Sequence, residues 1–181
     1  MSLLFTKRRP LLKPLLIATL VLTGLATSSH ADDLALASNT VQSKMVKIYG
    51  AGGLKGLEAY QSGFLISGDG HILTVWSYVL DTDYITIVLD DGRKFEGKIV
   101  GADPRLEMAV LKIDSQELDH FSLSKSVTLK PGARILTISN LFGVATGNEP
   151  CSVLHGIVSA TTSLNARRGA FKSPYQGPIY V

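Results

Sequence analysis

Short apolar segments rich in β-branched residues recur along most of the chain, separated by Gly, Asp and Pro. In the clearest segment, 84–89, apolar residues alternate with polar ones such as Thr86, which is the period of a half-buried strand. A polar turn at 90–93 follows, and a second alternating run at 94–100, which includes Ile99, comes after it. Because the turn contains a glycine, which can adopt a positive φ angle, this pattern predicts a β-hairpin.

Segments of the same kind predict a protein built mostly of short strands. No helical stripe longer than about ten residues follows residue 31. Many short strands at regular spacing are typical of a barrel or a sandwich, so we predict an all-β fold. The predicted strands are 45–49, 62–67, 71–76, 84–89, 94–100, 108–113, 134–139, 153–161 and 178–181.

The spacing of these strands indicates two folded parts. A polar N-terminal segment at 32–43 precedes a first β-barrel at 44–114, and a linker at 115–130 leads to a second unit at 131–181. The second unit offers few strands, and the sequence ends in an apolar run. A sheet that ends in this way leaves unpaired backbone along an edge. We therefore predict that the second barrel is incomplete and that the sequence is a fragment of a longer product.

The N-terminus has the pattern of a secretory leader. A basic start is followed by an apolar run at 15–27, which is shorter than the ~20 residues that span a bilayer as a helix. Small residues at Ser29 and Ala31 then predict a signal peptide at 1–31, cleaved after Ala31. The alternative is an uncleaved membrane anchor, since the apolar run can extend toward Leu11. In both cases we expect the folded part to be exported, to the periplasm or outside the cell.

The charge distribution excludes one class of partner, the polyanions. The chain carries 18 Lys and Arg against 15 Asp and Glu, a net charge of +3, but four of the cations lie at 7–13 in the leader. Without the leader, 14 cations face 15 acidic residues, so the folded part is close to neutral. Binding to a polyanion requires a basic face on the folded protein. We therefore expect no nucleic acid partner, and contact with a membrane only through an uncleaved leader.

The sequence predicts no cofactor and no metal. Cys151 is the single cysteine, which excludes an internal disulfide and a metal site built from cysteines. Four aspartates at 81, 83, 90 and 91 lie in turn-like stretches, but they do not supply the six or more oxygens that calcium requires. We interpret them as turn-forming residues.

A family resemblance spans about 44–160. The chain resembles the trypsin-like domain of the HtrA/Deg-type serine peptidases, because several sequence blocks follow one another in that family's order. The blocks are QSGFLIS (61–67), GDGHILT (68–74), DGRKF (91–95), VGADP (100–104), AVLKI (109–113), PG (131–132), ISNLFG (138–143) and GIVSA (156–160). The resemblance implies a trypsin-like double β-barrel with the active site in the cleft between the barrels, and often a peptide-binding PDZ domain after it.

The catalytic positions that the resemblance implies are degenerate. The place of the general-base histidine is occupied by Ser77, and that of the orienting aspartate by Glu107. A hydroxyl cannot accept a proton near neutral pH, and without an imidazole Glu107 has nothing to orient. The Gly-x-Ser-Gly-Gly turn of the nucleophile is absent from the 181 residues. We predict that no catalytic residue is intact and that this chain has no peptidase activity.

Two aromatic residues beside Ser77 are candidates for peptide binding. Trp76 and Tyr78 flank it, so their rings can form a platform for an extended peptide, with packing in the core or at its rim as the alternative. The histidines at 30, 71, 120 and 155 are expected in the leader, in turns or on strand surfaces rather than in a catalytic role.

Three functions remain open from the sequence. The first is an exported, inactive member of the peptidase family, a pseudo-peptidase, that binds extended or unfolded peptide. The second is an active serine endopeptidase whose nucleophile lies past Val181. The third is a truncated product without function. The sequence gives no expectation for the oligomeric state.

Overall fold

The structure is a computed structural model that describes residues 29–51, 59–124, 127–164, 167–168, 171–172, 175 and 177–181. The chain divides into two compact units, Met1–Ala37 and Ser38–Val181, and all of the described strands lie in the second unit. Most of the predicted signal peptide, 1–28, lies outside the described residues. In the part of the chain that is described, no helix is both long enough and apolar enough to cross a membrane.

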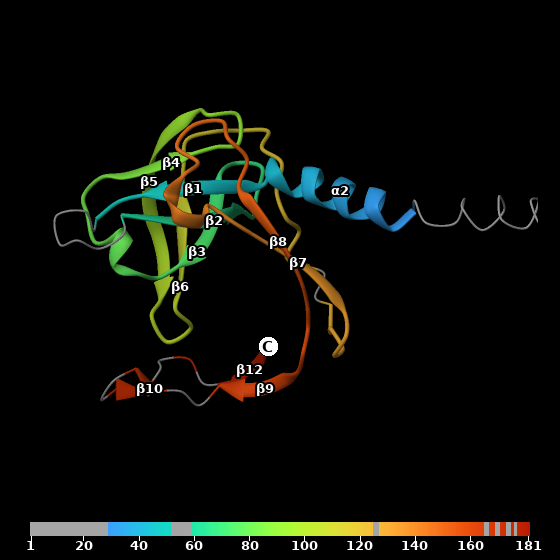
Figure 1. The fold of residues 1–181 in the computed structure, drawn as a ribbon. Helices are drawn as coiled ribbons and strands as arrows, with labels where there is room; N and C mark the ends of the chain where they lie inside the picture. The colour runs from blue at the N-terminus through green and yellow to red at the C-terminus, as the bar shows by residue number, and fades with distance from the viewer. Residues whose placement is uncertain are drawn as a thin grey trace, which may run out of the picture. The chain divides into compact units, whose positions relative to one another are not determined.

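The first six strands form a closed antiparallel barrel (Figure 1). Neighbours around the barrel follow the order β1-β2-β3-β6-β5-β4, so each strand pairs with a strand on both sides. The structure confirms the predicted strands of 44–114, with their ends displaced by at most three residues. The strands are β1 (Met45–Tyr49), β2 (Tyr60–Leu65), β3 (His71–Val75), β4 (Ile85–Val88), β5 (Lys94–Asp103) and β6 (Met108–Lys112).

The barrel interior is filled by alternating apolar residues, as the sequence pattern predicts. Ile85 and Ile87 are buried, whereas Thr86 between them is partly exposed. Leu118, from the predicted linker, also packs into this core, and the linker backbone at Phe121 donates a hydrogen bond to β2. The core consists of Val46, Ile48, Leu65, Ile72, Leu80, Ile85, Ile87, Leu89, Ala109, Leu111, Ile113 and Leu118.

The alternation fails at Ile99. This side chain is 41% exposed, although the pattern 94–100 predicts that it faces the core. The pairing of β5 with β6 shifts register between Ile99 and Gly101. A bulge of this kind turns a strand locally and re-aims its side chains. The prediction for Ile99 is therefore wrong, and the residue lines a surface pocket described below.

A helix that the sequence pattern does not indicate precedes the barrel. Helix α2 (Ser29–Gln42) covers most of the segment predicted to be polar and without helical periodicity. The segment is rich in Ala and Leu, which have high helix propensity, but its apolar residues do not form a single stripe. Periodicity therefore fails to detect it. The predicted cleavage after Ala31 falls within this helix.

The remaining strands form separate two-stranded sheets. Strand β7 (Arg134–Ser139) pairs with β8 (Ser152–Ile157), and β9 (Thr161–Leu164) pairs with β12 (Gly177–Tyr180). The short strands β10 (Arg167–Arg168) and β11 (Phe171–Lys172) form the third sheet. Leu154 and Ile157 on β8 remain 53% and 56% exposed. The structure thus confirms an all-β fold with one closed barrel and an incomplete second barrel.

The loop between β7 and β8 is held against β1 by buried polar groups. The Lys47 ammonium, on a side chain only 1% exposed, donates a hydrogen bond to the Gly147 carbonyl at 2.7 Å. The Asn140 amide donates to the Tyr49 hydroxyl and to the Ala145 carbonyl, and its oxygen accepts from the Ala145 N–H, each at 3.0 Å. The bonds to Lys47 and Tyr49 join the loop to β1 and fix it on the barrel, whereas the two bonds between Asn140 and Ala145 hold the loop's own conformation.

We expect Gly70→Ala to cost more stability than Gly132→Ala. Both glycines have positive φ, 95° and 86°, so each substitution costs about 1 kcal/mol of backbone strain. A Cβ at residue 70 would lie 2.7 Å from the Ile113 carbonyl oxygen, whereas one at residue 132 meets nothing within 4 Å. Overpacking should add about 1 kcal/mol or more at residue 70 alone. Urea denaturation measures the free energy of unfolding of both variants. Equal decreases in the two would contradict the predicted clash at residue 70.

Candidate functional site

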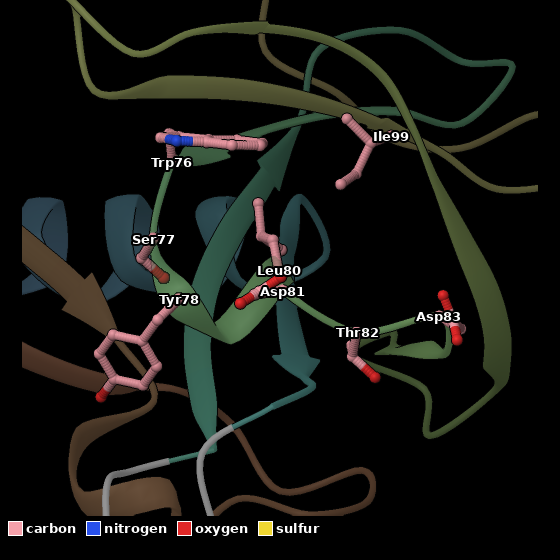
Figure 2. A pocket seen from close by; sticks show the side chains of 8 residues that line it. All are labelled: Trp76, Ser77, Tyr78, Leu80, Asp81, Thr82, Asp83 and Ile99. Carbon is pink, nitrogen blue, oxygen red and sulfur yellow. The ribbon is translucent and has the colours of Figure 1, made fainter.

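A pocket of about 680 Å³ lies beside the end of β3, where the family resemblance places the catalytic base (Figure 2). The stretch from Trp76 to Asp83, which contains the short 3-10 helix η2 (Tyr78–Leu80), supplies most of the lining, and β5 supplies Ile99. The lining residues are Trp76, Ser77, Tyr78, Leu80, Asp81, Thr82, Asp83 and Ile99. None of these residues is a histidine.

Ser77 forms the N-cap of helix η2. Its backbone is extended, with φ −144° and ψ 170°, and its hydroxyl oxygen accepts a hydrogen bond from the Val79 N–H at 3.1 Å. A serine in this position satisfies a backbone donor at the start of a helix. Ser77 therefore has a structural role at the position where the family resemblance places a proton acceptor.

The proton of the Ser77 hydroxyl is directed to an amide rather than to a base. Ser77 donates to the Gln61 side-chain oxygen at 2.5 Å. The Gln61 amide nitrogen in turn donates to the Thr74 hydroxyl at 2.9 Å and to the Val75 carbonyl at 3.0 Å. An amide oxygen is not a base at neutral pH, so it cannot remove the serine proton in a catalytic step. This network leaves Ser77 without the partner that a nucleophile requires.

Glu107 lies on a neighbouring segment, at the start of β6. It has a positive φ of 53°, and its backbone carbonyl accepts a hydrogen bond from the Trp76 N–H at 2.9 Å. The backbone thus brings the two family positions, 77 and 107, onto adjacent segments. The Glu107 side chain lines a different pocket, of about 440 Å³, together with Ser62, Phe64, Leu73, Thr74, Val75, Leu106, Met108, Leu164 and Tyr175.

Both aromatic candidates are accessible from solvent. Trp76 is 40% exposed and Tyr78 is 47% exposed, and both line the pocket. In Figure 2 the Trp76 ring lies on the same side of the pocket as Ile99, whereas the Tyr78 ring extends away from Trp76. Both rings therefore present surface to the pocket and to solvent.

His71 forms a hydrogen-bonded cluster with a serine and an aspartate, but its geometry is not that of a catalytic triad. Its Nδ1 atom lies 2.9 Å from the Ser67 hydroxyl oxygen and 3.0 Å from an Asp69 carboxylate oxygen. In a triad the serine and the aspartate contact opposite ring nitrogens. The Ser67 hydroxyl, followed by His71, lowers the pKa of Asp69 to about 2. The cluster stabilises the turn before β3, at the opposite end of that strand from Ser77.

The other candidate groups for nucleophilic chemistry lie elsewhere. His120 contacts the Leu118 carbonyl at 3.0 Å, and His155 is exposed on β8. Cys151 is buried, and desolvation raises the pKa of its thiol, although Lys47 acts in the opposite direction. A thiol with a raised pKa is a weak nucleophile. Among the residues that the structure describes, no three His, Cys, Asp or Glu side chains lie close enough together to hold a metal ion.

Sequence reasoning missed three members of the site. Gln61, which holds Ser77, lies 16 positions earlier, but pairing of β2 with β3 at Gly63 and Thr74 brings it next to the end of β3. The register of this hairpin could have indicated the contact. Asp81 and Asp83 are interpreted from sequence only as turn residues, and no sequence signal shows that they share a pocket with Trp76.

The chain matches a family model described as "Trypsin-like peptidase domain" over residues 61–178. A probable periplasmic serine endoprotease DegP-like from Ectopseudomonas mendocina is 43% identical over 99 residues, which cover 55% of this chain and 20% of the relative. A protein of the same name from Pseudomonas fulva is 40% identical over 111 residues, 61% of this chain and 22% of that protein. The chain therefore spans about a fifth of the length of these curated relatives.

Solved structures show the same similarity. The HtrA-type protease AlgW, solved with a tripeptide, aligns with a TM-score of 0.61 and 31% identity, covering 70% of this chain and 40% of that one. The serine endoprotease from Yersinia pestis aligns with a TM-score of 0.60 and 25% identity, covering 80% and 52%. Together with the closed barrel and the match over 61–178, these similarities show that the chain belongs to the trypsin-like peptidase domain family, in its HtrA/Deg branch.

Proposed function

We propose that this chain binds extended peptide at the pocket beside β3 and does not cleave it. The observation that carries the proposal is the bonding of Ser77, which caps η2 and donates its proton to Gln61 at the position of the family's general base. Loss of the base or the nucleophile from a serine peptidase triad lowers turnover by about a million-fold. Restoration of a nucleophile elsewhere would not replace the missing proton acceptor.

Two features support peptide binding. The pocket has solvent-accessible aromatic groups, Trp76 and Tyr78, and its volume is within the range of ordinary ligand sites. A related HtrA-type protease has been solved with a tripeptide. The closed barrel offers no free strand edge, so strand addition would have to use one of the described two-stranded sheets, such as β7–β8.

We infer that this binding takes place outside the cytoplasm. Curated relatives are named periplasmic serine endoproteases, and the sequence at 1–31 has the pattern of a signal peptide. A periplasmic protein of this kind would encounter unfolded, exported polypeptides as its ligands.

Trp76 provides a direct test, because it is the single tryptophan of the chain. Unstructured, N-acetylated peptides without tryptophan should change its fluorescence in a saturable manner, and mass spectrometry should find the peptides intact after prolonged incubation. Tyr78→Ala should weaken binding several-fold, because aromatic residues at a binding surface contribute strongly. The control is Tyr84→Ala, since Tyr84 is 64% exposed but does not line the pocket.

The possible outcomes separate the functions that the sequence leaves open. Saturable binding without cleavage supports the proposal. Cleaved peptide would instead indicate an active endopeptidase. If no peptide changes the Trp76 fluorescence, or if both tyrosine variants weaken binding equally, the proposed site is wrong.

A further inference from the structure

Two carboxylates in the pocket form no ion pair with the described residues, unlike three other carboxylates of the barrel. Asp69, Asp91 and Asp103 each form an ion pair with a residue two positions later, at distances of 2.7 to 3.2 Å. Asp81 and Asp83 are exposed and form no ion pair with any residue that the structure describes. The pocket therefore presents two negative charges that are available to a ligand.

The rest of the lining combines two hydroxyl residues, Ser77 and Thr82, with apolar and aromatic ones. Leu80 is only 3% exposed, and Ile99 and Trp76 present exposed surface beside it. Figure 2 shows Trp76 and Ile99 at the top of the view, Leu80 and Asp81 at the centre below them, and Asp83 at the lower right. An apolar surface that ends in carboxylates complements a side chain with a methylene stem and a cationic tip. Trp76 can add a cation–π contact.

Other cationic ligands fit this lining less well. Two exposed carboxylates do not supply the six or more oxygens that a calcium site collects, and an isolated metal ion would make no use of Ile99. An anionic side chain would be repelled by Asp81 and Asp83. A peptide α-amine carries the required charge but has no methylene stem to cover the apolar surface.

We propose that this pocket selects extended peptides that carry a lysine or arginine side chain, with the stem on Ile99 and Trp76 and the charge at Asp81 and Asp83. This inference rests on the proposed function, because it concerns the specificity of the same peptide site. It assigns separate roles to the two groups of residues: Trp76 and Tyr78 supply affinity for peptide in general, and the two aspartates supply the preference for a basic residue.

The experiment compares two N-acetylated peptides that differ at one position, lysine in one and norleucine in the other, with Trp76 fluorescence as the readout. Norleucine keeps the stem and removes the charge. We expect the lysine peptide to bind about tenfold more tightly, as two exposed carboxylates and one aromatic contact would give. The double variant Asp81→Asn/Asp83→Asn should remove this preference, and added salt should reduce it.

The matched control is Asp114→Asn/Asp119→Asn, which changes net charge equally at two exposed aspartates outside the pocket. It should retain the preference for lysine. Equal affinity for both peptides, or loss of the preference in the control as well, would overturn the inference while binding itself would still support the proposed function. A norleucine peptide with a free α-amine that binds as tightly as the lysine peptide would also overturn it. Absence of binding by any peptide would overturn both proposals.

Discussion

Leu111→Ala is expected to lower the free energy of unfolding by about 3 to 5 kcal/mol, the largest loss that we expect from a single substitution in this protein. Leu111 is fully buried on β6, in the interior of the closed barrel, and contributes to its apolar core. Truncation removes apolar surface burial and leaves a cavity that neighbouring strands cannot fill, because both of their edges are already paired. Urea denaturation followed by far-UV circular dichroism measures the loss.

The same substitution on β8 provides the control. Leu154 is 53% exposed, so Leu154→Ala should change the free energy of unfolding by about 1 kcal/mol or less. A difference of this size would show that stability resides in the first barrel. If Leu154→Ala were as costly as Leu111→Ala, the β7–β8 sheet would have to be covered in solution, and an incomplete second barrel would be contradicted.

Asn140→Ala is expected to cost about 3 kcal/mol, the second large effect, because removal of a buried partner costs about 1 to 3 kcal/mol for each group left unsatisfied. Asn140 is 3% exposed, and its side chain satisfies both the N–H and the carbonyl of Ala145. The Ala145 carbonyl would keep its bond from the Tyr49 hydroxyl. Most of the lost free energy of unfolding therefore comes from the Ala145 N–H and the Tyr49 hydroxyl oxygen, which lose their Asn140 partner.

Hydrogen exchange of the Ala145 amide distinguishes this mechanism from general destabilisation. Its protection should fall in Asn140→Ala by more than that of amides in β1. The control is Asn148→Ala, because Asn148 is exposed in the same loop and should cost little. Equal losses in the two asparagine variants would show that the buried network does not hold the loop on the barrel.

The sequence predicts the barrel well because its signal is local. Alternation over 84–89 and the glycine turn at 90–93 determine a hairpin, and Gly92 has the expected positive φ of 84°. The bulge at Ile99 is missed because it depends on the pairing register of two strands. Helix α2 is missed because it depends on helix propensity without a periodic apolar stripe. Hydrophobic patterning detects neither.

The candidate site is predictable only in part. The resemblance to the peptidase family predicts that Ser77 occupies the position of the base, and this assignment stays a prediction. The bond to Gln61 and the placement of Asp81 and Asp83 in one pocket with Trp76 depend on contacts between segments, which no local pattern specifies. Thus the sequence predicts which chemistry is missing, whereas the structure shows which contacts the residues there make.

The bonding of Ser77 also explains how the barrel holds this segment in place with a serine at the position where the family resemblance places the base. A histidine at this position contributes to catalysis through its ring nitrogens, whereas a serine satisfies the first backbone donor of η2 and binds Gln61. The segment that carries Trp76 and Tyr78 is therefore held in place without an imidazole. Under our proposal, a binding surface persists there without proton transfer.

The most direct test of an inactive barrel is reaction of the full chain with a fluorophosphonate probe, which modifies only activated serine hydroxyls, followed by intact-mass measurement. An active trypsin-like peptidase treated in parallel confirms that the probe is reactive. We predict no adduct, because the Ser77 proton is directed to Gln61 and the Ser67 cluster lacks triad geometry. An adduct on Ser77, or on any other serine of this chain, would contradict the central claim that the barrel binds peptide without an activated nucleophile.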